Sequence, residues 1–172
     1  MAEPEFVPLK IAILTISDTR TLETDTSGQI LVEQLAAAGH SLYQRQLVAD
    51  NIYQIRAVIS QWIADAEVNV IISTGGTGVT GRDGTPEAVS PLLDKQLDGF
   101  GEVFRMLSYQ EIKTSTVQSR AIAGVANGCY IFCLPGSGSA CRTAWHSLIK
   151  EQLDARTRPC NLVQLMPRLK EH

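Results

Sequence analysis

Short runs of apolar residues alternate along this chain with longer segments in which apolar residues recur at helical spacing. Short apolar runs bounded by polar loops are typical of strands buried in a parallel sheet. Three such runs are clear: 10–17, 68–72 and 129–134. A more polar, weakly alternating segment at 42–48 predicts a short strand or one at the edge of the sheet.

Helical spacing follows each predicted strand. It is clearest from 52 to 66, where one apolar stripe repeats and Asp50 and Asn51 offer capping side chains. Other segments predicted to be helical are 26–38, closed by Gly39, and 85–93, 103–107, 115–126 and 141–149. Residues 97–102 are expected to form a turn. Strands that alternate with helices predict a single three-layer α/β/α domain with a mostly parallel sheet.

The most informative stretch is 73–87, Ser-Thr-Gly-Gly-Thr-Gly-Val-Thr-Gly-Arg-Asp-Gly-Thr-Pro-Glu. It joins a predicted strand to a helix start, in which Thr85 is a candidate N-cap and Pro86 suits the first turn. Loops at the carboxyl ends of parallel strands bind ligands in open α/β sheets. Glycines let backbone N–H groups form a nest around an anion. This loop contains Gly75, Gly76, Gly78, Gly81 and Gly84.

Side chains of the same loop add to its capacity to bind an anion. Thr74, Thr77 and Thr80 offer hydroxyl donors. Arg82 supplies a cation, and Asp83 supplies a carboxylate of the kind that holds magnesium. The stretch is therefore predicted to bind phosphate or a nucleotide. A merely flexible linker is the alternative interpretation, although the predicted strand and helix bracket the glycines closely.

Two familiar phosphate-binding loops fit this stretch poorly. Residues 76–81 match G-x-G-x-x-G, but in a dinucleotide-binding fold the last glycine already lies inside the helix. Here Arg82, Asp83 and Gly84 come before the helix start. A P-loop requires Gly-Lys followed by Ser or Thr, and that lysine is missing. Both interpretations are therefore disfavoured.

Polar residues also follow the first two predicted strands. Ser17, Asp18, Asp25 and Ser27 follow the first strand, and Asp50 follows the second. Because parallel strands end at the same edge of a sheet, we expect these side chains near the glycine loop. For Asp25 and Ser27 ordinary helix capping is the favoured interpretation. Asp50 is either a cap or a carboxylate that points toward the loop.

A second unit of strand, glycine-rich loop and helix occurs at 129–149. The strand runs into Pro135-Gly-Ser-Gly-Ser139. Ser137, Ser139 and the free N–H groups of a helix start make it a candidate for a second anion site. The alternative is a tight turn with serine caps. Two anion sites in one sheet would suit a nucleotide together with a phosphorylated substrate.

Composition narrows the class of protein. A length of 172 residues with 44% hydrophobic residues suits one globular domain, predicted at 10–153 between a lead-in at 1–9 and a polar tail at 154–172. The net charge of -3 argues against a large nucleic-acid-binding face. No stretch is apolar enough to span a membrane and no signal peptide is recognised, which predicts a cytoplasmic protein. No C-x-x-C pair occurs among Cys129, Cys133, Cys141 and Cys160. Because two of them fall in a predicted strand and one on a predicted helix, small core residues are favoured over zinc ligands or disulfides.

Four motifs, in a fixed order, carry a resemblance to a known family. They are Thr74-Gly-Gly-Thr-Gly78 followed by Arg82-Asp83-x-Thr85-Pro86-Glu87-Ala88, then Gly99-Phe-Gly-Glu102 with Arg105-Met106, then Thr114-x-x-x-Gln-Ser-Arg120, and finally Leu134-Pro-Gly136. In these motifs the chain resembles the molybdopterin-binding MoaB/MogA family, over about residues 11–160. Residues 99–108 and 152–160 resemble the B branch of that family most closely.

The resemblance implies a ligand and a reaction. Members bind molybdopterin, a pterin with a dithiolene and a terminal phosphate. Active members transfer AMP from Mg-ATP to that phosphate and release pyrophosphate. Such a transfer requires phosphates held in line and charge neutralised at the α-phosphorus. The resemblance implies that Asp50 and Asp83 are catalytic and hold magnesium. It assigns substrate or nucleotide binding to Ser17, Asp18, Thr74, Gly75, Gly76, Thr77, Gly78, Arg82, Thr85, Glu102, Pro135, Gly136 and Ser137.

The resemblance also implies partners. It predicts a homotrimer or homohexamer and a molybdenum-insertion protein downstream, with no nucleic acid and no membrane. A small-residue segment at 121–126 is compatible with a subunit contact. The chain keeps both Arg82 and Asp83 but departs from the adenylyltransferase pattern at Gly84 and Ser137. A non-enzymatic molybdopterin carrier or a scaffold protein of the same pathway is therefore the alternative function.

Overall fold

The computed structural model describes residues 2–172, which form one six-stranded sheet in the order β2-β1-β3-β6-β5-β4. The strands are β1 (Lys10–Ile16), β2 (Ser41–Val48), β3 (Val70–Thr74), β4 (Lys95–Gln96), β5 (Ile122–Ala126) and β6 (Cys129–Leu134). The pairs β1–β2, β1–β3 and β3–β6 are parallel, whereas β5 is antiparallel to both β4 and β6. The predicted mostly parallel sheet is confirmed, and the most polar predicted strand, β2, lies at an edge.

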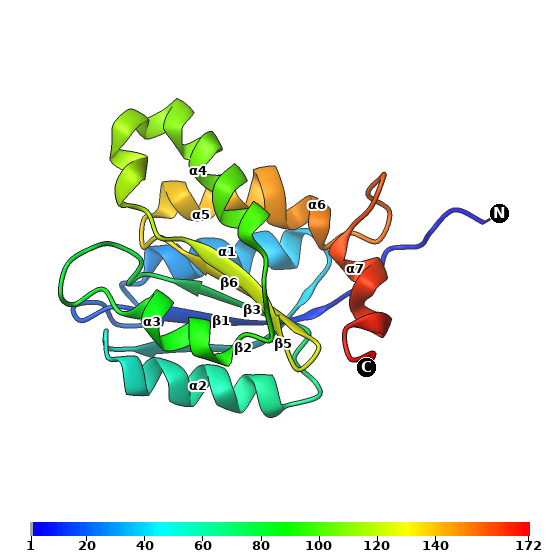
Figure 1. Ribbon diagram of the computed structural model, residues 1–172, viewed down its shortest axis with the longest axis horizontal. Coiled ribbons are helices and arrows are strands. Elements are labelled where there is room, and N and C mark those ends of the chain that lie inside the picture. Colours follow the sequence, from blue (N-terminus) through cyan, green and yellow to red (C-terminus); the bar gives the residue numbers. More distant parts are fainter. Residues whose placement is uncertain (1) are drawn as a thin grey trace.

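Helices cover both faces of this sheet. They are α1 (Thr26–Ala37), α2 (Ile52–Ala64), α3 (Thr85–Val89), α4 (Asp98–Ile112), α5 (Gly138–Ala144), α6 (Lys150–Gln152) and α7 (Leu162–Leu165). Short 3₁₀ turns follow α3, α4 and α7, and a π-helical turn, Trp145–Ile149, joins α5 to α6. In Figure 1, α1, α4, α5 and α6 lie on one side of the sheet and α2 and α3 on the other. The predicted α/β/α layering is confirmed.

Two apolar cores result from this layering. Along β1, Ile11 and Ile13 pack toward α1 and α5, whereas Ala12 and Leu14 pack toward α2. Because helices cover both faces of the strand, its side chains are buried on both sides. The strand is therefore an almost continuous apolar run and does not alternate apolar with polar residues. Trp62 of α2 is buried in the second core, as its place in the helical stripe predicts. No helix within residues 2–172 is both long and apolar enough to cross a membrane.

The parallel strands end at one edge of the sheet. Thr15 of β1 is paired with Thr74 of β3, and Thr74 is paired in turn with Leu134 of β6. The loops that follow these strands therefore leave the sheet side by side. In Figure 1 this edge lies opposite the end of the molecule where the two termini are found. The fold thus brings the two glycine-rich loops together, as their positions after parallel strands predicted.

The prediction of a helix at 115–126 was wrong. The 3₁₀ turn η2 (Lys113–Gln118) covers only the first residues of this range, and β5 and β6 then form a hairpin. Its turn is Asn127-Gly128, with φ of 49° and 77°, which is the left-handed conformation that these two residue types favour. Alanine is a strong helix former, but intrinsic propensity is a weak predictor, and pairing with β6 outweighs it here.

The predicted turn at 97–102 was also wrong, because Asp98 begins α4. Gly99 and Gly101 both lie inside this helix. A Cβ atom at Gly101 would come 2.8 Å from the carbonyl oxygen of Ala121. This glycine therefore allows the helix to approach the start of β5 closely. It indicates tight packing between the two elements and not a turn.

Candidate functional site

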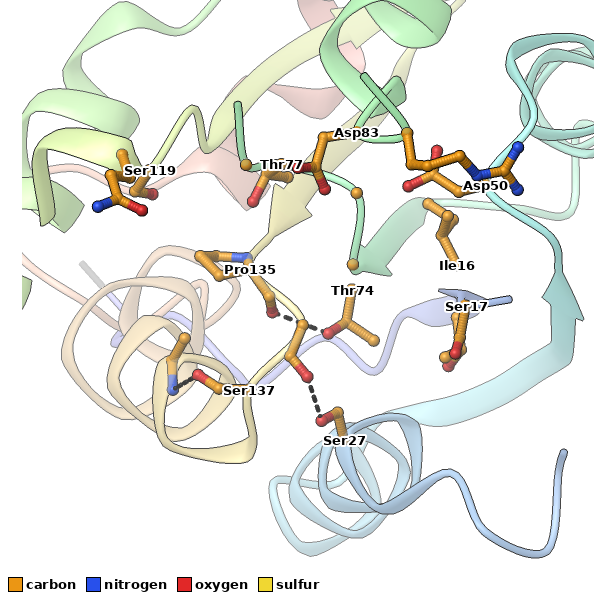
Figure 2. Close-up of a pocket in the computed structure, with 18 of the residues that line it drawn as sticks. Ile16, Ser17, Ser27, Asp50, Thr74, Thr77, Asp83, Ser119, Pro135 and Ser137 are labelled. Carbon is orange, nitrogen blue, oxygen red and sulfur yellow. Dashed lines mark hydrogen bonds between the residues drawn. The ribbon is translucent and has the colours of Figure 1, made fainter. Parts of the chain in front are cut away.

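The loops at the carboxyl edge of the sheet surround a hollow of about 600 Å³ (Figure 2). Residues after β1, β2, β3 and β6 line it, together with one side of α4 and the segment that follows α4. Most of the residues predicted for the site line this hollow: Ser17, Asp18, Asp50, Thr74, Gly75, Gly76, Thr77, Gly78, Arg82, Asp83, Pro135, Gly136 and Ser137.

The first part of the glycine loop folds back on the ends of the strands. Gly75 and Gly76 have φ of 107° and 69°, and a Cβ atom at Gly75 would collide with the carbonyl oxygen of Ile16. The N–H of Gly75 donates to the carbonyl of Leu134 at 2.9 Å, which ties the loop to β6. Only glycine fits both the backbone angle and the space at Gly75.

Thr85 supports this loop from behind. Gly84, not Thr85, precedes α3 as its N-cap, so the prediction of a Thr85 cap was wrong. The hydroxyl of Thr85 donates instead to the carbonyl of Gly75 at 2.9 Å, and its N–H donates to that of Gly76 at 3.0 Å. Thr85 is fully buried and does not line the hollow. It therefore holds the glycine backbone in place.

Two carboxylates lie against the glycine loop. A Cβ atom at Gly76 would come 3.0 Å from Asp50 Oδ2, and one at Gly78 would come 2.6 Å from Asp83 Oδ2. Asp50 does not cap α2, because Asn51 accepts the N–H groups of that helix start. Figure 2 shows Asp50 and Asp83 on the same side of the hollow. Of the two interpretations of Asp50, the carboxylate that points toward the loop is the one observed.

The two carboxylates differ in their surroundings. Burial raises the pKa of Asp50, and the charge of Asp83 adds to this effect, although Asp50 accepts a hydrogen bond from the N–H of Gly84 at 3.2 Å. Burial also acts on Asp83, but hydrogen bonds from the N–H and hydroxyl of Thr80, with the charge of Arg120, hold its pKa below the usual value. Their mutual repulsion makes the pair a favourable place for a cation.

Asp18 and Arg82 form an ion pair at the mouth of the hollow. Arg82 Nη2 lies 2.7 Å from Asp18 Oδ1, and the N–H of Asp50 donates to the same oxygen at 3.0 Å. The hydrogen bond from Arg82, followed by that from Asp50, lowers the pKa of Asp18. The arginine side chain is 67% exposed. The pair therefore links the loops after β1, β2 and β3 while its cation faces solvent.

The opposite side of the hollow is built around the loop after β6. Thr74 Oγ1 donates to the carbonyl of Pro135 at 2.9 Å, and Ser27 Oγ donates to that of Gly136 at 2.7 Å (Figure 2). Ser137 accepts the N–H of Ala140 and caps α5, which is the tight-turn interpretation of this loop. The capping prediction for Ser27 was wrong, because its hydroxyl serves this contact.

Asp25 does cap α1, accepting the N–H of Gly28 at 2.9 Å, as predicted. It also has a second role that its sequence neighbours do not reveal. Thr15 Oγ1 donates to its carboxylate at 2.6 Å, and Arg45 Nη2 lies 3.0 Å from it. The Asp25 side chain is 2% exposed, so Arg45 compensates a buried charge behind the hollow.

Glu102 lies outside this hollow. It lines a separate depression of about 180 Å³ together with Arg105. The reason is the helix that replaced the predicted turn: Phe104 and Ser108 of α4 face the main hollow, and Glu102 projects from another side of the same helix. The structure therefore corrects the placement of Glu102 in the pocket of this chain.

Several lining residues were not predicted. They are Thr15, Ile16, Arg20, Asp25, Ser27, Phe104, Ser108, Ile112, Ser115, Gln118, Ser119 and Ala140. The favoured interpretation of Asp25 and Ser27 was helix capping. Gln118 and Ser119 belong to one of the motifs that carried the family resemblance, which was the only signal for them. Residues of α4 and η2 reach the hollow because these elements pack over the sheet edge. The remaining residues lie at the end of β1, in the loop after it and at the start of α5.

A second hollow, of about 620 Å³, lies beside the first. Asp50, Arg82 and Asp83 line both. The rest of its lining comes from the start of α2, the tip of the glycine loop, and the side chains of Glu87 and Arg120. The carboxylate pair and its neighbouring cation thus stand at the border of two adjoining spaces. The fold and the site define an α/β protein in which a glycine-rich loop and two carboxylates border two adjoining hollows.

Comparison with known proteins identifies the family. Residues 12–155 match the family described as the probable molybdopterin binding domain. Molybdenum cofactor biosynthesis protein B of Escherichia coli K12 is 57% identical over 157 residues, which cover 91% of this chain and 92% of that relative. The chain therefore belongs to the molybdopterin-binding domain family of molybdenum cofactor biosynthesis proteins.

Solved structures agree with this assignment. A crystal structure of a molybdenum cofactor biosynthesis protein B matches with a TM-score of 0.86 and 40% identity, over 100% of both chains. The tungsten cofactor synthesizing protein MoaB of Pyrococcus furiosus matches with a TM-score of 0.79 and 31% identity, over 95% of this chain and 98% of that one. The predicted fold family is confirmed.

Proposed function

We propose that this protein binds molybdopterin in the hollow beside the glycine loop and transfers AMP from Mg-ATP to its terminal phosphate. One observation carries the proposal. Asp50 and Asp83 lie against Gly76 and Gly78 of an anion-binding loop, at the border of two adjoining hollows. That border is where two phosphorylated substrates held in separate spaces would meet.

The carboxylate pair fits a magnesium ion. Magnesium is usually held by one or two carboxylates and completes its shell with water and substrate phosphates. Within residues 2–172 there is no cluster of three or more His, Cys, Asp or Glu side chains that could hold a metal. Asp50 and Asp83 would hold the ion. When bound, it would neutralise charge on the phosphate oxygens around the reacting phosphorus.

The remaining residues position the two substrates. An oxygen of the molybdopterin phosphate forms a bond to the α-phosphorus of ATP, and the bond from that phosphorus to the bridging β-oxygen breaks, so that pyrophosphate leaves. Backbone N–H groups of Gly76 and Thr77 would hold the phosphate oxygens, as glycine nests do. Arg82, exposed at the border, would add positive charge. Holding the reactants in line supplies most of the rate in such transfers.

A non-enzymatic molybdopterin carrier is the second candidate. The ion pair between Arg82 and Asp18 favours it, because Asp18 already neutralises the charge of this arginine. The carrier also agrees with the departures at Gly84 and Ser137. It would bind molybdopterin without turning over ATP.

We further propose that chains associate into a trimer or hexamer and pass their product to a molybdenum-insertion protein. The apolar side chains exposed on and just after α4 support the association: Val103, Met106, Tyr109, Ile112 and Val117. The segment 121–126 does not support it, because it forms the buried strand β5 and not a surface helix.

The test of the proposed reaction is Asp83→Asn, which keeps the shape of the side chain and removes its charge. With molybdopterin and Mg-ATP, we expect wild-type protein to release pyrophosphate and form adenylyl-molybdopterin. The variant should be slower by about 10²-fold or more, because a charged group at the reacting phosphorus is lost. Asp94→Asn is the matched control, since Asp94 accepts a hydrogen bond from Asn127 far from the hollow.

Near-normal turnover by Asp83→Asn would remove Asp83 from the mechanism. Molybdopterin binding by the wild-type protein without any pyrophosphate would instead establish the carrier. Equilibrium binding of molybdopterin, measured on the same preparations, separates these outcomes from a protein that has lost its fold.

A further inference from the structure

Arg120 contacts the glycine loop at more points than any residue considered so far. Its N–H donates to the carbonyl of Thr77 at 2.9 Å. Its side chain donates from Nε to the carbonyl of Gly78 at 2.7 Å and from Nη2 to the carbonyl of Asp83 at 3.1 Å. The same guanidinium forms an ion pair with the carboxylate of Glu87. Arg120 lines the second hollow but not the first.

These contacts lie at the two ends of the loop tip, residues 78–83. The tip contains Gly78 and Gly81, and a glycine-containing segment loses much conformational entropy when it is ordered. Inside the tip, Asp83 accepts hydrogen bonds from the N–H and the hydroxyl of Thr80. Those bonds hold the shape of the tip but not its place on the molecule. Outside contacts to the tip include the ion pair of the exposed Arg82 with Asp18. Arg120 adds a tether that joins both ends of the tip to the segment leading into β5.

An arginine suits this role better than other cations. Its planar guanidinium presents five donors in fixed directions, so that it can reach two carbonyls and a carboxylate together. Glu87, in the first turn of α3, accepts from the Nη groups and orients the fork. Arg120 also acts on the pKa of Asp83, as its charge favours the ionised carboxyl. The arrangement is a clamp, which we define as Arg120, Glu87 and the carbonyls of Gly78 and Asp83.

We propose that Arg120 is a positioning residue: through the carbonyls of Gly78 and Asp83 it holds the Asp83 carboxylate in register with Asp50 for the metal-dependent step. The proposal rests on the proposed adenylyl transfer for its kinetic consequence, and on the loop alone for its structural one. Arg120 does not line the first hollow, and in this proposal it acts through the loop.

The chain offers a matched control in Arg56 of α2. Arg56 also donates to two backbone carbonyls, Nε to Ala88 at 3.0 Å and Nη2 to Glu87 at 2.8 Å. Both carbonyls belong to α3, next to the glycine loop but not in it. Arg56→Gln therefore removes a comparable set of contacts from the neighbouring helix and leaves the loop tethered.

The experiment compares Arg120→Gln, Arg120→Lys and Arg56→Gln with wild-type protein by hydrogen–deuterium exchange and by steady-state kinetics with molybdopterin and Mg-ATP. In Arg120→Gln we expect amide exchange across 75–84 to accelerate by about tenfold or more. We expect kcat to fall by about 10²-fold, because a displaced reacting group loses its alignment. The magnesium concentration for half-maximal rate should rise.

Arg120→Lys should recover little of this loss, since one ammonium group cannot bridge both carbonyls and Glu87. Arg56→Gln should keep wild-type loop exchange and the wild-type magnesium requirement. Wild-type loop exchange in Arg120→Gln overturns the proposal, and so does an equal effect of Arg56→Gln. A wild-type protein that makes no adenylyl-molybdopterin would refute the proposed function, and loop exchange would then decide the role of Arg120 by itself.

Discussion

His40 is buried where the start of β1 meets the helix that follows β6. Only 6% of its surface is exposed, and its Nδ1 accepts a hydrogen bond from the N–H of Leu9 at 3.1 Å. The rings of Phe6 and Trp145 lie 5.1 Å and 6.3 Å from it between centroids. Burial lowers its pKa, and the charge of Asp154 opposes that effect in part. The folded protein therefore favours the neutral ring with Nδ1 unprotonated.

The free energy of unfolding is therefore expected to fall as the pH drops below about 6.5, the usual pKa of histidine. Below this pH His40 takes up a proton more readily in the unfolded chain than in the folded protein, because its pKa is lower in the folded state. Acid therefore favours unfolding. Urea unfolding at pH 7.5 and 5.5 measures the effect. His40→Gln, which keeps an acceptor for Leu9, should lose most of the difference.

The carboxylates whose pKa values are lowered, such as Asp18 and Asp83, would contribute only at more acidic pH, below their usual values near 4. Asp50, whose pKa is raised, acts in the opposite direction, because a raised carboxyl pKa makes the fold more stable as the pH falls. A loss of stability between pH 7.5 and 5.5 is therefore assigned to the histidine. An equal pH dependence in wild-type protein and His40→Gln would show that another group is responsible.

At the scale of elements, the hairpin between β5 and β6 adds an antiparallel strand to the parallel part of the sheet. Its turn depends on Gly128, which has φ of 77°. An L-residue in the left-handed region costs about 1–2 kcal/mol. Gly99 provides the opposite case, since it lies in α4 and a Cβ atom there would meet nothing within 4 Å.

Gly128→Ala is accordingly expected to lower the free energy of unfolding by about 1–2 kcal/mol, because alanine is strained at positive φ. Gly99→Ala should raise it by about 0.5–1 kcal/mol, because alanine favours the helix and reduces the entropy of the unfolded chain. Urea unfolding midpoints test whether the two variants change the free energy of unfolding in opposite directions. Two shifts in the same direction would contradict the assignment of the turn or of the helix.

At the scale of the whole molecule, the exposed apolar side chains are concentrated on one element. Met106, Tyr109 and Ile112 of α4 are 59%, 48% and 50% exposed. Single exposed apolar residues are ordinary, but several on one helix mark an interaction surface. Tyr53 of α2, 77% exposed on the other side of the sheet, has no such neighbours among the exposed apolar residues of α2.

If α4 forms the proposed subunit contact, the wild-type protein should sediment as a trimer or hexamer of the 18.7 kDa chain. Met106→Glu should reduce the mass toward that of the single chain, because it buries a charge in an apolar contact. Tyr53→Glu should leave the mass unchanged. A wild-type protein that sediments as a monomer at micromolar concentration would refute the association, and an equal effect of Tyr53→Glu would refute the choice of surface.

Much of the fold could be predicted because its signals are local. Covered strands need apolar runs, and covered helices need one apolar stripe, so β1, β3, β6 and α2 were each evident from composition and period. The position of the candidate site at the carboxyl edge of the sheet could be predicted from the order of the strands and the composition of the loops. The β5 hairpin had a local signal as well, Asn127-Gly128, but its alanine-rich strand was interpreted as a helix.

What the sequence by itself determined is therefore the layering, the sheet edge that carries the site and the chemistry of the glycine loop, because each depends on residues close together in the chain. Only the tertiary structure decided which distant groups meet there. It paired Arg82 with Asp18, turned Asp50 toward the loop, left Glu102 outside the hollow and brought Arg120 to the loop carbonyls. Such contacts depend on how α4 and the loops pack across the sheet. They join residues far apart in the chain, so no local sequence pattern predicts them.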